Sequence, residues 1–334
     1  MTHGFRLAGV NVLAGIDNDE SCKYAYEKNN KSKFIKNDIR NVSGIELGAL
    51  YNNYKIKILI GCAPCQTFAR YTKDDESDER WKLLYEFARI VKESNPDVVS
   101  MENVPRLKNY LNGKVFNDFV NSLKELGYFV SYDLLYCPDY GVPQKRKRLV
   151  LLASKFGPIA LPKKLYDPIN YLTVKKAIGP LEPIEAGETS KKDPLHYSRK
   201  LEMINKLRII KTPSGGDWRD WPKELVLDCH KKESGKSFKN VYGRMLWEEP
   251  SPTITTESIN FGTGRFGHPE QNRALSLREM AILQSFPKYY DFIDKKRKFS
   301  STNIARHIGN AVPVKLGQVI AESIIKHIED HHIE

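Results

Sequence analysis

The chain has 334 residues, enough to bury a full core and to form roughly two domains. Its longest apolar run falls well short of the ~20 residues that cross a bilayer, and its first residues lack the apolar core of a signal peptide. We therefore expect a cytoplasmic protein with no membrane partner. The net charge of +12 favours a polyanionic partner, although a basic surface without such a partner has the same composition.

The first half of the chain alternates strand-like and helix-like segments. Short apolar runs predict strands at 12–16, 55–61, 97–101, 128–136 and 149–153. Apolar residues at helical spacing predict helices at 81–91 and at about 114–126, the second ending at Gly127. This alternation predicts an α/β fold with a doubly wound, mostly parallel sheet.

The second half is less regular. Three prolines in 154–170 predict a domain boundary, and the mixed composition from about 170 to 272 predicts an irregular, loop-rich region. Ser276 and Glu279 form a capping box that opens a helix. A C-terminal helix is predicted from Pro313, with an apolar stripe at Leu316, Ile320, Ile324 and Ile328.

Five cysteines are too few and too scattered for a disulfide framework in a cytoplasmic chain. Cys62 and Cys65 form a single CxxC, which is compatible with half a zinc site or a thiol redox pair. The histidines show no ligand spacing relative to this pair, so we predict no metal. In the redox or zinc alternative both cysteines would be needed.

Polar residues follow three of the predicted strands, where ligands of doubly wound sheets bind. Cys65 follows strand 55–61, Glu102 closes strand 97–101, and Arg146 and Arg148 precede strand 149–153. Each has a simpler interpretation taken alone: a buried cysteine, a capping carboxylate and a solvated basic turn. Together they are compatible with a nucleophile, a general acid and cationic groups around one substrate.

These segments closely resemble, in the same order, motifs of the DNA (cytosine-5) methyltransferases. The matching motifs are Pro64-Cys-Gln66, Glu102-Asn-Val104, Gln144-Lys-Arg-Lys-Arg148, the segment 273–287, and His307-Ile-Gly-Asn-Ala-Val-Pro313. The resemblance covers nearly the whole chain. It implies the Rossmann-like sheet of class I methyltransferases in a catalytic domain (1–165 plus 305–334), a target-recognition domain (166–272) and a hinge (273–304).

The resemblance implies covalent catalysis on a cytosine flipped out of the duplex. Cys65 would add to C6 of the ring, and Glu102 would protonate or hydrogen-bond N3 so that electron density collects at C5. Arg146 and Arg148 would hold the base carbonyl and a phosphate and favour the thiolate. The polar segment 66–80 after the nucleophile would close over the DNA.

The resemblance also implies S-adenosylmethionine as cofactor and a specific double-stranded DNA sequence as partner. The implied cofactor residues are Asp17, Asn18, Asp38, Ile39, Pro64, Leu83, Asn310 and Val312. The implied DNA contacts are Gln66, Gln144, Arg219, Arg244, Thr253 and Arg265. We expect a nucleoid-associated bacterial protein that acts as a monomer on DNA, with a restriction endonuclease as a possible genetic partner.

The chain departs from the family at its N-terminus, because 2–9 resemble the helix after the family's first strand and its Phe-x-Gly-x-Gly-Gly turn. An incomplete or misassigned start is the explanation we favour. A separate polypeptide that supplies the strand, and a degenerate protein, are the others. Two alternative functions are therefore an RNA cytosine-5 methyltransferase and a catalytically impaired DNA-binding relative. The long recognition region favours duplex DNA over RNA.

Overall fold

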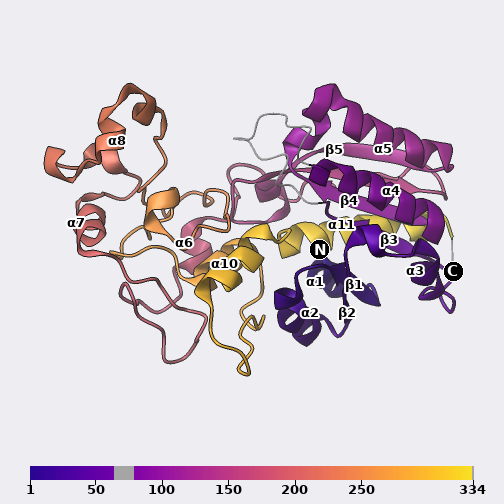
Figure 1. Ribbon diagram of the computed structural model, residues 1–334, viewed down its shortest axis with the longest axis horizontal. Helices are drawn as coiled ribbons and strands as arrows, with labels where there is room; N and C mark the ends of the chain where they lie inside the picture. Colours follow the sequence, from indigo (N-terminus) through magenta and orange to yellow (C-terminus); the bar gives the residue numbers. More distant parts are fainter. Residues whose placement is uncertain (64–78, 333–334) are drawn as a thin grey trace. The chain divides into compact units, whose positions relative to one another are not determined.

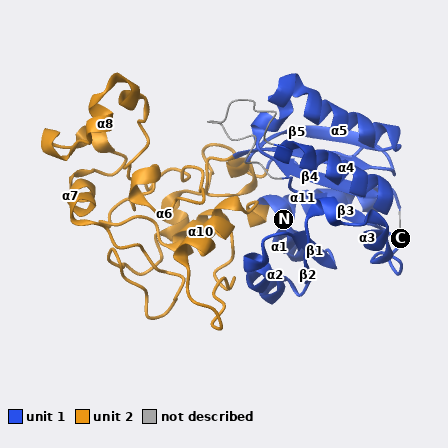
Figure 2. Ribbon diagram, in the orientation of Figure 1, with its two compact units in different colours: residues 1–136, 147–164, 316–334 blue, residues 137–146, 165–315 orange. Residues whose placement is uncertain are grey.

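The computed structural model describes residues 1–63 and 79–332. The chain forms two compact units (Figure 2). Unit 1 contains 1–136, 147–164 and 316–334, and unit 2 contains 137–146 and 165–315. Unit 1 carries the strands, whereas unit 2 is built from short helices and long connecting segments (Figure 1).

The bounds of the described elements are as follows. The strands are β1 (Ala14–Asp17), β2 (Lys33–Lys36), β3 (Ile58–Gly61), β4 (Val98–Asn103), β5 (Phe129–Tyr136) and β6 (Lys147–Ser154). The α-helices of unit 1 are α1 (Thr2–Leu7), α2 (Lys23–Asn30), α3 (Gly44–Ala49), α4 (Leu83–Ser94), α5 (Lys114–Glu125) and α11 (Val314–Asp330). Those of unit 2 are α6 (Val174–Ile178), α7 (Met203–Lys211), α8 (Asp228–Lys231), α9 (Leu277–Leu283) and α10 (Ser301–Asn310).

The predicted strands and helices of unit 1 are present, each within a few residues of its expected bounds. The α/β class is therefore confirmed. The pairs β1–β2 and β3–β4 are parallel, while β6 runs antiparallel to both β4 and β5. The described strands form two separate sheets: a two-stranded sheet, β1–β2, and a four-stranded sheet, β3–β4–β6–β5.

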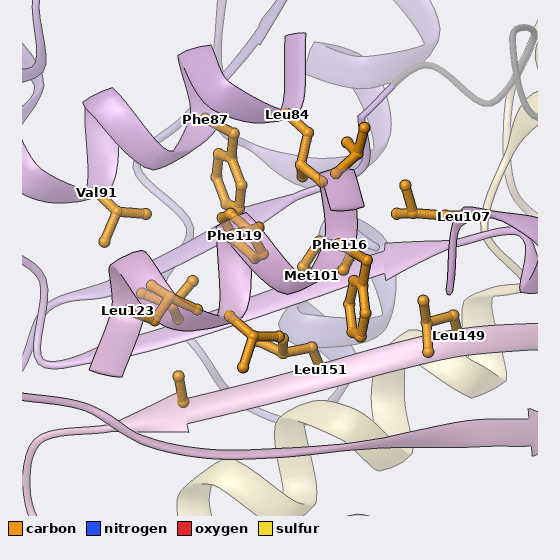
Figure 3. Packing of buried hydrophobic residues seen from close by; sticks show 14 of the residues in the cluster. Leu84, Phe87, Val91, Met101, Leu107, Phe116, Phe119, Leu123, Leu149 and Leu151 are labelled. Atoms are coloured by element: carbon orange, nitrogen blue, oxygen red, sulfur yellow. The ribbon is translucent and has the colours of Figure 1, made fainter. Parts of the chain in front are cut away.

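The core of unit 1 lies between the four-stranded sheet and the helices α4 and α5 (Figure 3). Phe87 of α4 stacks on Phe119 of α5, with 5.7 Å between ring centroids. Met101 and Leu151 are register partners on β4 and β6, and both face this core. Helix α11 covers the opposite face of the sheet, where His327 hydrogen-bonds the Ser154 hydroxyl at 2.7 Å.

Two glycines allow helices to pack closely on the strands that flank the division of the sheet. A Cβ atom on Gly15 of β1 would lie 2.4 Å from the hydroxyl of Tyr26 in α2. One on Gly61 of β3 would lie 2.5 Å from the ring of Phe87. Each strand is thus covered on one face by an aromatic side chain that only glycine accommodates.

Unit 2 has a small aromatic core and little regular structure. Trp218, Trp221 and Phe261 are buried together with Ile209. The indole nitrogens of Trp218 and Trp221 donate to the Phe238 carbonyl and the Thr212 hydroxyl. The predicted capping box of α9 is confirmed, since Ser276 accepts from the Glu279 amide and Glu279 accepts from the Ser276 amide.

The C-terminal helix begins one residue after the predicted Pro313. Leu316, Ile320 and Ile324 are fully buried, as the apolar stripe predicts, while Ile328 is only partly buried. Among residues 1–63 and 79–332, no helix is both long and apolar enough to cross a membrane.

Candidate active site

A cavity of about 600 Å³ opens in unit 1 between β1 and β3. We call it the β1–β3 cavity. Its walls come from α1, β1, the segment after β2, β3 and the start of α4. The volume lies within the range of small-molecule sites, ~300–1,000 Å³. Most of its lining is apolar, and its acidic groups come from segments that follow strands.

Asp17 and Asn18 lie on this cavity at the carboxyl end of β1. Both side chains are exposed. Oδ1 of Asp17 accepts the amide of Asp19 at 2.8 Å, which orients the carboxylate. The other carboxylate oxygen remains able to accept hydrogen bonds from ribose-type hydroxyls.

Asp38 and Ile39 line the same cavity after β2. Arg40 hydrogen-bonds the Asp38 carboxylate and lowers its pKa to about 2, so this group stays ionised at neutral pH. The backbone of this segment is held by α4, because Arg89 donates to the Ile39 carbonyl at 3.0 Å. Arg89 was not among the predicted site residues. It lies three residues after Glu86 and four before Glu93, and this helical spacing is typical of the ion pairs that it forms with both.

Leu83, the first residue of α4, contributes an apolar wall to the cavity. Asn310 and Val312 belong to unit 2: Asn310 ends α10 and is exposed, whereas Val312 is buried. Five of the eight predicted cofactor residues thus meet at one cavity: Asp17, Asn18, Asp38, Ile39 and Leu83.

Glu102 and Arg148 form a buried ion pair. Nε of Arg148 lies 2.7 Å from Oε1 of Glu102, and the side chains are only 11% and 7% exposed. Glu102 Oε1 accepts no aligned hydrogen bond from the described residues, so its acceptor capacity is open to a ligand. The Nη1 of Arg148 donates to the Lys147 carbonyl at 2.8 Å, which fixes the guanidinium.

Asn103 ties this pair to the segment that leads to Cys65. Its side-chain amide donates to the Ala63 carbonyl at 3.0 Å. In the parallel β3–β4 ladder Gly61 is the partner of Met101, so Cys62 follows β3 at the level where Glu102 lies near the carboxyl end of β4. Asn103, the second residue of the Glu-Asn-Val motif, was not among the predicted site residues, although its place beside Glu102 was the available signal.

The predicted nucleophile Cys65 lies outside the described residues, together with Pro64 and Gln66. Cys62 is exposed, directly before this segment. Among the described residues, no cluster of three or more histidine, cysteine or acidic side chains is suited to a metal.

Arg146 and Gln144 are buried in unit 2. Nη1 of Arg146 donates to the Ile254 carbonyl at 2.9 Å and contacts Oε1 of Gln144. The Gln144 amide donates to Leu283 and Gln284, while its oxygen accepts the Ile254 amide. Gln144 is therefore a structural link inside unit 2 in this structure, rather than the exposed DNA contact that we predicted.

Arg244, Arg265 and Arg219 differ in exposure, although all three were predicted DNA contacts. Arg244 is buried and donates to the carbonyls of Thr212, His268, Gln271 and Ile209 and to the side chain of Asn272. This prediction needs correction, because the guanidinium has no donor left for DNA. Arg265 binds the carbonyls of Gly215 and Gly216 and the carboxylate of Asp217. Arg219 is the most exposed of the three, although its Nε and Nη2 both donate to the Asp217 carboxylate.

Thr253 is the remaining predicted DNA contact. Its hydroxyl donates to the Lys145 carbonyl at 2.8 Å, and the hydrogen bond is exposed to solvent. The threonine therefore joins the Pro252-Thr-Ile254 segment to residues 144–146 within unit 2.

A sequence model of one protein family, described as C-5 cytosine-specific DNA methylase, matches residues 1–326. The chain is a C-5 cytosine-specific DNA methylase. The buried Glu102–Arg148 pair and the mostly apolar cavity with Asp17 and Asp38 on its lining are thus features of a DNA-modifying enzyme.

Characterised relatives support this membership. The methylase is 52% identical to the type II methylase M.HgiDII of Herpetosiphon aurantiacus, over 99% of this chain and 94% of the relative. It is 34% identical to the type II methyltransferase M1.HphI of Haemophilus parahaemolyticus, over 97% and 83% of the two chains. Among solved structures, a DNMT2 variant of Spodoptera frugiperda aligns with a TM-score of 0.64 at 17% identity, covering 97% and 95%. That likeness shows the fold.

Proposed function

We propose that this methylase transfers a methyl group from S-adenosylmethionine to C5 of a flipped cytosine in a specific double-stranded DNA sequence. The observation that carries the proposal is the buried Glu102–Arg148 pair, which lies at the sheet edge where the segment containing Cys65 begins. The fold then belongs to the Rossmann-like class I methyltransferases, with 1–165 plus 305–334 as catalytic domain, 166–272 as target-recognition domain and 273–304 as hinge.

The residues of the β1–β3 cavity fit S-adenosylmethionine. Asp17 with Asn18 suits ribose hydroxyls, and the ionised Asp38 suits an amine donor such as that of adenine. Ile39 and Leu83 supply apolar surface for a flat ring. Pro64, Asn310 and Val312 complete the proposed set. When bound, S-adenosylmethionine supplies an electrophilic methyl group, whose acceptor is C5.

Cys65 supplies the nucleophile. Its thiolate adds to C6 of cytosine, and the electron pair of the C5–C6 bond moves to C5. Glu102 holds a proton at N3 in this step, because negative charge would otherwise build up on the ring. After methylation a solvent water accepts the C5 proton, the C5–C6 double bond re-forms as the Cys65 thiolate leaves, and the N3 proton returns to Glu102.

The two arginines act electrostatically. Arg148 fixes the Glu102 carboxylate through the 2.7 Å ion pair, so that an oxygen remains directed to the base. We propose that Arg146 contributes positive charge for the base carbonyl while its Ile254 contact holds it.

We propose that Gln66, Arg219 and Thr253 bind DNA as a duplex. Arg265 stabilises the segment that contains Arg219 through its contacts with Gly215, Gly216 and Asp217. The half-exposed guanidinium of Arg219 can contact a guanine edge or a phosphate. The net charge of +12 supports a polyanionic partner. The type II names of M.HgiDII and M1.HphI support a methylase of a restriction-modification system, and we propose that it acts as a monomer beside a cognate endonuclease.

A methyl-transfer assay with matched cysteine variants tests this function. We expect Cys65→Ser to abolish transfer to DNA, because serine is a far weaker nucleophile, whereas Cys62→Ser keeps most of the activity. Sites methylated in host DNA are mapped by bisulfite sequencing. Equal loss in both variants would favour a thiol pair, and transfer to tRNA but not DNA would favour the RNA alternative.

A further inference from the structure

The segment between α9 and α10 carries an excess of positive charge. Residues 288–299 contain five basic and two acidic side chains and include the run Lys295-Lys-Arg-Lys298. The structure describes the whole segment, which forms no helix or strand (Figure 1). We call it the basic loop. It belongs to unit 2, and none of its residues has a role in the proposed reaction, cofactor site or target recognition.

Aromatic packing fixes the two ends of the basic loop. Near its start, Phe292 is buried against Phe286 and Tyr290, with 5.0 and 4.8 Å between ring centroids. At its end, Phe299 packs edge-on to Tyr197, with 5.5 Å between ring centroids. The basic run between these contacts is therefore presented from a defined base.

Asp294 shapes the tip of the basic loop. Its Oδ1 accepts the amide of Lys296 at 2.9 Å, and its carbonyl accepts the amide of Arg297 at 3.0 Å. Aspartate favours the first position of such a turn because its side chain can bond the backbone two residues on. The Arg297 guanidinium lies 3.5 Å from the same carboxylate. The turn thus uses one of the two carboxylates of the loop and its only arginine.

The three lysines of the tip, Lys295, Lys296 and Lys298, are exposed. Among the residues that the structure describes, none of the three forms an ion pair or a side-chain hydrogen bond. Adjacent like charges repel one another, so the arrangement favours an anionic partner over a role in stability. The run spans at most ~10 Å of chain, a length over which B-DNA carries about six phosphate charges.

The type of residue indicates which part of the DNA is contacted. Lysine carries a compact ammonium on a flexible stem, which suits it to neutralise phosphates as a point charge. Contacts to phosphates position a protein on the duplex and carry no sequence information. The basic loop also lies in the proposed hinge, 273–304, beyond the proposed target-recognition domain.

We propose that the basic loop is a second DNA-binding surface, which contacts phosphates of duplex DNA outside the recognised sequence through Lys295, Lys296 and Lys298. The inference rests on the proposed function in one respect, that duplex DNA is the partner. The loop adds affinity that is independent of sequence. It therefore holds the methylase on DNA between targets and leaves the choice of target to the recognition domain.

The salt dependence of DNA binding tests these contacts. The probe is a duplex of about 40 base pairs that contains only A·T pairs, so it offers neither a target nor a cytosine. In the triple variant Lys295→Gln, Lys296→Gln and Lys298→Gln, the slope of log affinity against log salt should fall in magnitude by about 2–3, because each lost phosphate contact removes ~0.9. At about 0.1 M salt the affinity should fall at least about tenfold. Fluorescence anisotropy between about 50 and 200 mM salt measures both.

Two further triple variants separate local contacts from overall charge. Lys23→Gln, Lys28→Gln and Lys33→Gln remove the same charge from exposed lysines of α2 and β2 in unit 1. We expect this control to change the slope by less than about 0.5, because it removes no phosphate contact. Replacing the three loop lysines by arginine keeps their charges and should keep the slope. All of these substitutions replace exposed side chains, so the melting temperatures should be nearly equal.

Equal slopes in the unmodified chain and in the glutamine variant of the loop would overturn the proposal, as would an equal loss in the unit 1 control. Loop-dependent binding to vesicles of anionic lipid, without loop-dependent binding to the duplex, would assign the loop to a membrane surface instead. Methyl transfer is measured separately. An unmodified chain that transfers no methyl group to DNA, yet differs in slope from the loop variant, contradicts the proposed function and supports the loop. A methylating chain with unchanged slopes contradicts the loop alone.

Discussion

At the scale of single residues, the proposed methyl transfer depends on Glu102. Its carboxylate is buried, held by Arg148 at 2.7 Å, and still has acceptor capacity on Oε1. A buried charge of this kind is costly unless it is paired, so a residue kept there for stability alone would use all of its acceptors. Oε1, which contacts Arg148 without accepting an aligned hydrogen bond, therefore favours a role toward a ligand.

Glu102→Gln tests that role. The amide keeps the volume and one acceptor for Arg148 but cannot pass a proton to N3, so we expect kcat to fall by about a hundredfold or more. DNA affinity should change little, since the phosphates are contacted elsewhere. Single-turnover methyl transfer measures kcat, and fluorescence anisotropy measures binding. A variant with unchanged kcat would remove Glu102 from the chemistry.

Two arginines of unit 2, Arg244 and Arg219, are expected to have opposite effects on stability and on DNA binding when each is replaced by alanine. Arg244→Ala removes a guanidinium donor from four carbonyls, of which those of Ile209 and Gln271 keep a backbone amide partner, so we expect a loss of about 3–5 kcal/mol in unfolding free energy. Arg219→Ala should change stability by less than about 0.5 kcal/mol and weaken DNA binding instead. Urea unfolding and DNA titration measure the two effects. Weak DNA binding by a fully stable Arg244→Ala protein would contradict the assignment.

At the scale of elements, the turn before α9 contains a buried cluster of charged and polar groups. Arg273 binds Glu279 through two 2.7 Å contacts. Burial is the largest single influence and raises the pKa of Glu279, but Arg273, His268 and the Ser276 amide together lower it to about 2. His268 lies beside them, and Nδ1 accepts the amides of Glu270 and Gln271. Burial lowers the pKa of His268 to about 4, so the ring is neutral when folded.

This cluster predicts acid sensitivity with a defined sign. Because the unfolded histidine has a pKa near 6.5 and the folded one about 4, the unfolded state binds the extra proton between these values. Stability is therefore lost as the pH falls from about 6.5 to about 4, by roughly 3 kcal/mol. His268→Asn keeps an acceptor and should flatten this dependence. Thermal unfolding at several pH values measures it, and an equally steep loss in the variant would contradict the assignment.

The sequence predicted regular elements better than irregular ones. Apolar periodicity within short segments predicted the strands β3 to β6 and the helices α4, α5 and α11. Arg244 and Gln144 were predicted as DNA contacts because an arginine or glutamine looks the same in a sequence whether it is exposed or buried. Their partners lie tens of residues away, beyond any local pattern.

At the scale of the whole molecule, the chain joins an α/β unit to an irregular one. The predicted cofactor residues divide between them: Asp17, Asp38 and Leu83 lie in unit 1, and Asn310 and Val312 in unit 2. The sheet divides between β1 and β3, two strands far apart in sequence, as expected from the sequence if the family's first strand is missing. The basic charge of the whole chain agrees with DNA as the substrate of the family.

The central claim is a covalent Cys65–cytosine intermediate in duplex DNA. The most direct measurement is trapping on DNA that carries 5-fluorocytosine at the mapped target, with S-adenosylmethionine present, because fluorine at C5 prevents release of the enzyme. We predict a denaturation-resistant complex whose peptide mass places the base on Cys65, at equal yield in Cys62→Ser and absent in Cys65→Ser. A methylating enzyme that forms no such complex, or forms it through Cys62, would contradict the account.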